Sequence, residues 1–190
     1  TTDRFAQNFM QLWSKPAHAL TLPSLFFNGT WVESGKRVVM SNCVIDTTNF
    51  VHLDDIAAMV GYPVRLSTAV TMSARSPYLC PPGTVSHNGR KQHVVDGAYF
   101  ENSGALTAGE LIELVKKVCL ENPEFSVFKP VAVIVTNTPL NPCSNNASAK
   151  KRKLKKPLLL IGSSAPLLTF LNSRLARGYH AERLLQKITG

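Results

Sequence analysis

The sequence predicts an α/β fold with a mostly parallel central sheet. Short apolar runs typical of buried strands alternate with stretches of helical periodicity, which is the pattern of α/β proteins. One run, Val131 to Val135, is continuously apolar, as expected of a parallel strand that is buried on both faces. With 190 residues, 44% hydrophobic and 17% charged, the chain has the size and composition of a globular domain.

The first strands are expected to form a hairpin or to be near neighbours. Residues 25–27 are apolar and residues 37–40 form a second apolar run, with a turn at residues 33–36 between them. Asn28-Gly29-Thr30 is expected to end the first strand, because these residue types favour turns.

Two short helices and a strand are expected next. Asp54-Asp55 can cap a helix through Met59 that Gly61 closes. Residues 65–74 are small and apolar and predict a buried helix. Residues 93–95 predict a strand that Asp96-Gly97 ends sharply.

The second half predicts two helices and two buried strands. An amphipathic helix begins at Thr107 and ends before Pro123, because apolar residues recur there at helical spacing. Residues 131–135 and 158–161 predict strands, and residues 166–186 a final helix.

The net charge of +9 is concentrated in one segment. Six basic residues lie between Lys150 and Lys156, within a predicted flexible loop at 141–157. Such a run can attract an anionic membrane surface or nucleic acid, and a solvated loop is the simpler interpretation. No helix-turn-helix, zinc finger or RNA-binding signature accompanies it, so we expect no nucleic-acid partner.

The most informative segment for chemistry is Val94 to Gly104. Asp96 stands at the carboxyl end of a predicted buried strand, where α/β proteins place their sites. The following glycine lets the backbone turn tightly and lets another segment approach. From Asp96-Gly97 alone, an ordinary strand followed by a turn is the simpler interpretation.

Four segments in order resemble the patatin-like phospholipase family. Val94 to Gly104 is similar to its Asp-Gly-Gly/Ala segment, and residues 25–39 resemble its N-x-T-x-x-x-x-G-x-R hairpin. Residues 66–77 are similar to its small-residue helix ending at a proline, and residues 171–178 resemble a helix near the end of bacterial members.

The resemblance implies a serine lipid acyl hydrolase, a phospholipase or esterase, with a Ser-Asp dyad and a three-layer fold. Asp96 matches the aspartate position of the family and is assigned the general-base role. The nucleophilic serine and the oxyanion glycines would lie upstream of Thr1. Residues 1–190 are then the C-terminal portion of one patatin-like domain, and no metal or organic cofactor is implied.

Other candidate catalytic residues are weaker. Ser164 follows a predicted strand, but Pro166 stands where an elbow needs glycine, and a helix cap explains the segment. His93 and Asp96 should point to opposite faces of one strand. The histidines show no metal-ligand spacing, and Asp54-Asp55 is explained by helix capping.

The expected partners are a lipid or acyl-ester substrate and an anionic membrane surface. A parallel sheet without its first strands exposes apolar edges, so the chain should also pair with a missing N-terminal half or self-associate. The expected location is the cytoplasm, with peripheral membrane association as an alternative. The alternative function is a non-catalytic binding or scaffold module of the same fold, acting through its basic loop on membranes or on a protein partner.

Overall fold

The computed structural model describes residues 3–75, 79–125, 127–135 and 158–189 of the chain. The chain divides into two compact units, Thr1–Phe100 and Glu101–Gly190. The predicted loop at 141–157, with its basic run, lies outside the described residues.

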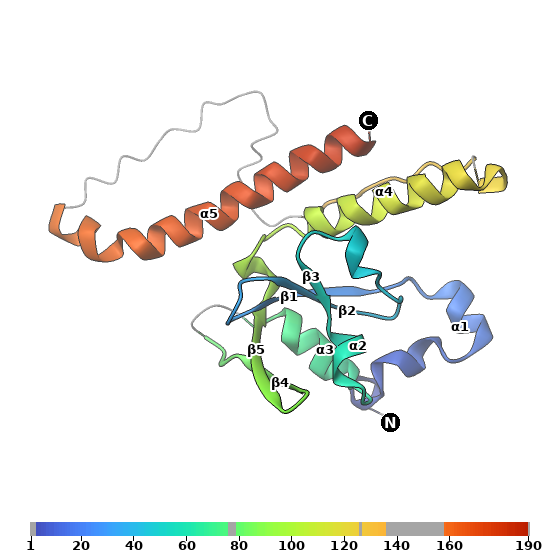
Figure 1. The fold of residues 1–190 in the computed structure, drawn as a ribbon, viewed down its shortest axis with the longest axis horizontal. Coiled ribbons are helices and arrows are strands. Elements are labelled where there is room, and N and C mark those ends of the chain that lie inside the picture. The colour runs from blue at the N-terminus through green and yellow to red at the C-terminus, as the bar shows by residue number, and fades with distance from the viewer. Residues whose placement is uncertain (1–2, 76–78, 126, 136–157, 190) are drawn as a thin grey trace. The chain divides into compact units, whose positions relative to one another are not determined.

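The first unit contains a mixed five-stranded sheet, in the order β3-β2-β1-β5-β4 (Figure 1). β1 pairs antiparallel with β2 and β5, β4 pairs antiparallel with β5, and β3 pairs parallel with β2. The strands are β1 (Phe26–Trp31), β2 (Arg37–Ser41), β3 (Leu53–Asp55), β4 (Gly83–His87) and β5 (Arg90–Asp96).

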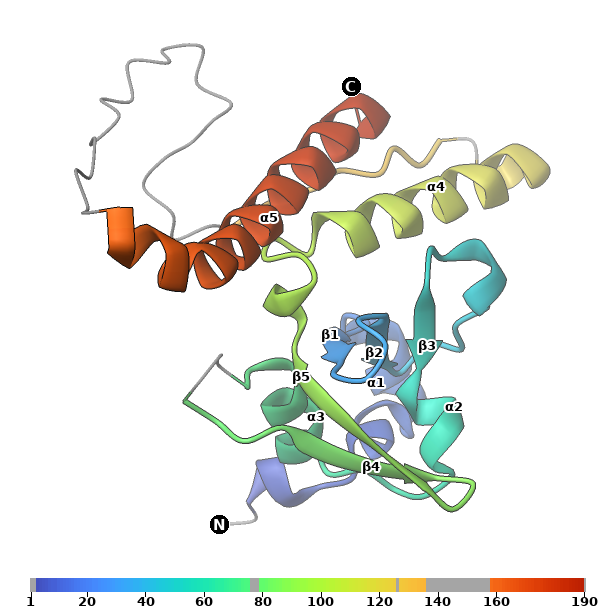
Figure 2. The ribbon, with the colours of Figure 1, turned by 60° about the vertical axis from the view of Figure 1, so that its left-hand side comes forward.

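The helices confirm the α/β class. In the first unit, α2 and α3 lie on one face of the sheet, as Figure 2 shows. The α-helices are α1 (Pro16–Thr21), α2 (Ile56–Val60), α3 (Leu66–Ser73), α4 (Ala105–Glu121) and α5 (Leu158–Thr189). The 3₁₀ helices are η1 (Arg4–Ala6), η2 (Phe9–Trp13), η3 (Thr47–Asn49), η4 (Gly97–Tyr99) and η5 (Pro123–Phe125).

The predicted hairpin is confirmed, but its first strand is longer than expected. Asn28, Gly29 and Thr30 continue β1, and each pairs with a residue of β2. Gly29 and Thr30 also pair with β5. Ladder hydrogen bonds on both sides therefore outweigh the turn preference of these residues.

The caps of the short helix α2 agree with the sequence prediction. The Asp55 carboxylate accepts hydrogen bonds from the backbone N–H groups of Ala57, at 2.8 Å, and Ala58, at 3.3 Å. Gly61 ends the helix with a φ of 61°, a conformation that glycine adopts without steric cost.

The core of the first unit lies between the sheet and its helices. Phe9 is fully buried and packs against the rings of Trp13 and Phe27, at centroid distances of 5.3 and 5.6 Å. The buried members of the core are Phe9, Trp31, Val38, Met40, Ile56, Ala69, Met72, Val85 and Val94. Burial of these side chains supplies most of the hydrophobic stabilisation of the unit.

The second unit is built on the packing of α4 against α5. Its buried cluster consists of Ala105 and Ile112 of α4 with Ala181 and Leu185 of α5. The predicted amphipathic helix is present as α4, but it begins at Ala105 rather than at the expected Thr107. It directly follows Gly104, which has a φ of 71°.

Two predicted strands are wrong. Residues 131–135 belong to no strand, and Val131, Val133 and Val135 are 82%, 84% and 94% exposed. A buried strand is stable only when neighbouring strands take up its backbone groups, and no described segment pairs with this one. Residues 158–161 form the start of α5, because a leucine run suits a helix as well as a strand.

A mostly parallel, three-layer arrangement is not confirmed. Three of the four strand pairings among the described residues are antiparallel. The expected parallel strands were those at residues 131–135 and 158–161, and neither forms. The structure therefore confirms the α/β class, since it contains a sheet and helices, but not the parallel arrangement of the strands.

The described residues contain no membrane-spanning helix, and the three cysteines among them are free. None of the described helices is long and apolar enough to span a bilayer. Cys43, Cys80 and Cys119 are free thiols, and Cys119 is partly buried. Cys143 lies outside the described residues.

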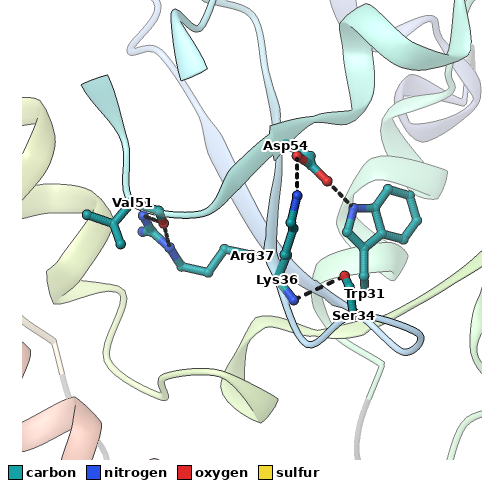
Figure 3. Close-up of polar contacts among 6 residues, drawn as sticks. All are labelled: Trp31, Ser34, Lys36, Arg37, Val51 and Asp54. Atoms are coloured by element: carbon teal, nitrogen blue, oxygen red, sulfur yellow. Dashed lines mark hydrogen bonds and ion pairs between the residues drawn. The ribbon is translucent and has the colours of Figure 1, made fainter. Parts of the chain in front are cut away.

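One end of the hairpin is fixed by polar contacts (Figure 3). Trp31 is 1% exposed, and its indole Nε1–H donates to Asp54 Oδ2 at 2.9 Å. Lys36 Nζ lies 3.9 Å from Asp54 Oδ1. Arg37 donates from Nη2 to the Val51 carbonyl at 2.7 Å. These contacts join β1, β2 and β3 on the side of the hairpin turn.

Asp54→Ala should lower the free energy of unfolding by about 1–3 kcal/mol, because the buried Trp31 N–H loses its acceptor. Lys36→Gln is the matched control. It removes the other partner of Asp54, a half-exposed ion pair expected to contribute less than about 1 kcal/mol. Urea denaturation of both variants measures the difference, and equal losses would contradict this assignment.

Candidate functional site

Asp96 is the last residue of β5 and lies opposite Gly29 of β1. Successive side chains on a strand alternate between the two faces, so Asp96 shares a face with Val94. Val94 belongs to the buried core. The carboxylate therefore lies at the end of a strand on the face of the sheet that α2 and α3 cover.

The backbone and one carboxylate oxygen of Asp96 are fixed. Asp96 Oδ1 accepts from the Ala98 N–H at 2.8 Å and thereby caps η4. The Asp96 carbonyl accepts from the Thr30 hydroxyl at 3.2 Å, and its N–H donates to the Arg75 carbonyl at 3.4 Å. Within the described ranges, Asp96 Oδ2 has no hydrogen-bond partner.

Gly97 is required by a close approach of β1. A Cβ at this position would lie 2.9 Å from both the Cβ and the carbonyl oxygen of Asn28. Contacts this short with backbone atoms force a displacement. The glycine after the aspartate therefore has the role expected from the sequence, which is to let another segment approach.

Three of the four segments that carry the family resemblance meet at this point. The Ser73 hydroxyl, at the end of α3, donates to the Asn28 carbonyl at 2.7 Å. The Arg75 carbonyl accepts from the Asp96 N–H. The hairpin strand, the small-residue helix and the Asp-Gly turn are thus in direct contact. Residue types alone could not identify Ser73 and Arg75 as the residues that link these segments.

The fourth segment, residues 171–178, belongs to the second unit. A Cβ on Gly178 would collide with the Asn102 side-chain oxygen and lie 3.3 Å from Glu101 Oε1. Gly178 therefore allows α5 to pack on residues that follow the Asp-Gly turn. Within the second unit, residues 171–178 therefore lie against Glu101 and Asn102, near the end of the Val94 to Gly104 segment.

The loop before α4 is organised by the buried carboxylate of Glu101. This carboxylate accepts from the Ser103 hydroxyl at 2.5 Å and from the Leu106 N–H at 3.4 Å. A carboxylate at the start of a helix is stabilised by the helix dipole. Burial raises the pKa of Glu182, and the nearby Glu101 charge adds to this effect.

His93 is not brought to Asp96. Its Nδ1 lies 2.6 Å from Glu33 Oε1, and both side chains are 41% exposed. Hydrogen bonds from the His93 backbone and ring lower the pKa of Glu33. The opposite orientation of residues 93 and 96 follows from the alternation of the strand, as predicted.

The other candidate residues have structural roles where the structure describes them. Ser164 lies within α5, so the structure has neither a serine elbow nor the expected helix cap at this position. In the described part of the chain, no group of three His, Cys, Asp or Glu side chains could hold a metal ion.

The arrangement offers a proton acceptor. A carboxylate held by one oxygen and open at the other can take a proton from a hydroxyl that approaches the open oxygen.

Comparisons of the chain with protein-family models, curated proteins and solved structures find no match.

Gly97→Ala should destabilise the first unit by about 1–3 kcal/mol, because the added methyl group would overlap Asn28. Gly109→Ala is the matched control. Its Cβ would meet Ile188 Cδ1 at 3.6 Å, an ordinary contact, and alanine is favoured inside a helix by about 0.5–1 kcal/mol. Thermal unfolding should move in opposite directions for the two variants, and a neutral Gly97→Ala would be evidence against the close approach.

Proposed function

We propose that the chain is part of a serine lipid acyl hydrolase, a phospholipase or esterase that uses a Ser-Asp dyad. Asp96 is the general base, and the nucleophilic serine and oxyanion glycines lie on a preceding segment of the protein. The observation that carries the proposal is the Asp96 carboxylate, fixed through Oδ1 and without a partner at Oδ2 in the described residues.

The chemistry follows from the needs of a weak nucleophile. A serine hydroxyl attacks an acyl ester only when a base takes its proton, and the open Asp96 oxygen can accept that proton directly. Backbone N–H groups of a glycine-rich loop would stabilise the oxyanion that forms. The proton on Asp96 passes to the alcohol that leaves when the tetrahedral intermediate breaks down to the acyl-serine. Water then attacks the acyl-serine with Asp96 again as the base, and this second step releases the carboxylic acid and returns the proton to the serine oxygen.

The contact among the hairpin, α3 and the Asp-Gly turn supports the resemblance to the patatin-like family. Three segments that are similar to the family in sequence, and far apart in the chain, contact one another around Asp96. Coincidental motif matches have no reason to meet at one place. The proposal therefore assigns to Asp96 the general-base role that the aspartate has in the family.

The same proposal includes the three-layer, mostly parallel arrangement. Residues 131–135 form an apolar segment that belongs to no helix or strand and has no pairing partner among the described residues. In the proposed whole domain, strands of the preceding half pair with this segment, which forms no strand among the described residues. Its exposed valines are then buried.

The second candidate function is a non-catalytic scaffold module acting on membranes or on a protein partner through the basic residues at 150–156. One observation favours it: no serine hydroxyl within the described ranges hydrogen-bonds to Asp96. In this alternative, Asp96 acts only as the cap of η4.

A longer chain that carries the sequence encoded upstream of Thr1 should hydrolyse a short-chain nitrophenyl ester and react with a fluorophosphonate probe. Asp96→Asn in that chain should lower the turnover by roughly 10²–10⁴-fold, because the serine loses its base. The 190-residue chain alone should neither turn over the ester nor be labelled.

Glu33→Gln in the longer chain is the control. It removes an exposed carboxylate on a residue that contacts His93 and not Asp96. Loss of activity in both variants would count against a specific role of Asp96. Labelling of the 190-residue chain would show that the nucleophile is within it, and an inactive, unlabelled longer chain would favour the scaffold function.

The 190-residue chain should self-associate, because Val131, Val133 and Val135 are almost fully exposed and their segment pairs with no strand in the described residues. Val133→Lys should shift sedimentation towards the monomer. Val127→Lys is the matched control, since Val127 is also 84% exposed but lies outside the segment. A monomeric parent chain would refute the association.

A further inference from the structure

The first unit contains two adjoining cavities on the helical side of its sheet. The larger, of about 330 Å³, lies between α2, α3 and β4, and the smaller, of about 250 Å³, lies beside η2. The residues that line both cavities are Met40, Val60, Tyr62, Pro63 and Val64. The larger cavity alone is within the size range of small-molecule sites.

The floor and the rim of the larger cavity differ in chemistry. The floor is formed by the side chains of Met40, Ile56, Met72 and Val85, which are 2–8% exposed. Unbranched methionine side chains adapt to ligands of varied shape. The rim is polar and exposed, and consists of Tyr62, Arg65, Thr68 and Thr84.

Arg65 is the charged residue among those that line the two cavities, and no acidic residue lines either. Within the part of the chain that the structure describes, the Arg65 guanidinium has no hydrogen-bond or ion-pair partner. A guanidinium at the edge of an apolar cavity favours a ligand that combines an alkyl chain with an anionic end. A cationic ligand finds no acidic partner among the lining residues.

The wall that carries Arg65 is held in place by the N-terminal segment. The Phe9 N–H donates to the Val64 carbonyl at 2.8 Å, and the Leu66 N–H donates to the Gln7 carbonyl at 2.9 Å. These bonds fix the backbone on both sides of Arg65. The cavity therefore exists before a ligand binds, which reduces the entropic cost of binding.

We propose that this cavity binds a single-chain fatty carboxylate, with the alkyl chain over Met40 and Met72 and the carboxylate at Arg65. The site is separate from the dyad chemistry, because none of its lining residues is part of the Asp96 turn. Binding is thus expected whether or not the protein hydrolyses esters.

Titration of octanoate into the chain labelled with ¹³C at the methionine methyl groups tests the proposal. The Met40 and Met72 resonances should shift and saturate, because both side chains line the cavity. Met59 is the internal control, since it packs on the same core but does not line either cavity. Unmoved Met40 and Met72 resonances overturn the proposal.

Two variants separate recognition of the ligand's carboxylate from burial of its alkyl chain. Arg65→Gln should weaken octanoate binding by roughly tenfold and leave 1-octanol binding unchanged. Arg90→Gln, at an exposed arginine outside the cavity, should change neither affinity. Equal weakening of both ligands by Arg65→Gln contradicts the role of the guanidinium.

A third variant closes the mouth of the cavity. Thr68→Trp places a large ring at the exposed rim and leaves the buried floor intact, so it should abolish the shifts caused by both ligands. Unchanged binding in a folded Thr68→Trp protein would place the ligand elsewhere and overturn the proposal. Asp96→Asn should bind octanoate normally, which keeps this site distinct from the proposed hydrolase.

Discussion

The close approach of β1 to the ends of β5 and α3 is the constraint on which the rest of the first unit depends. Gly97 leaves room for Asn28, and the backbone carbonyl of Asn28 accepts a hydrogen bond from the Ser73 hydroxyl. A single residue of the central strand therefore fixes both the Asp-Gly turn and the end of α3. The orientation of the Asp96 carboxylate is a product of that contact rather than of its own hydrogen bond alone.

The sequence predicts best where the signal is local. The caps of α2 at Asp55 and Gly61, the amphipathic helix before Pro123 and the sharp end of β5 at Asp96 follow from neighbouring residues, and all are present. The candidate site at Asp96 is predicted from its residue type and from its position at the end of a strand. Its supporting groups, Ser73 and Arg75, are recognised only when the fold brings them together.

The predictions that depend on distant partners are the wrong ones. Asn28 to Thr30 were expected to end a strand, but pairing with β2 and β5 keeps them extended. Residues 131–135 have the composition of a buried strand, yet composition cannot supply the neighbouring strands that such a segment needs. Residues 158–161 are as well suited to a helix as to a strand, and continuity with α5 decides the outcome.

Gly29 has a consequence for how this sequence can change over time. A Cβ there would lie 2.9 Å from the methyl groups of both Val38 and Val94, on the two strands that flank β1. A larger residue at position 29 therefore needs smaller residues at both positions 38 and 94. These three positions form a coupled set, and substitutions in related chains should appear at them in compensating combinations rather than singly.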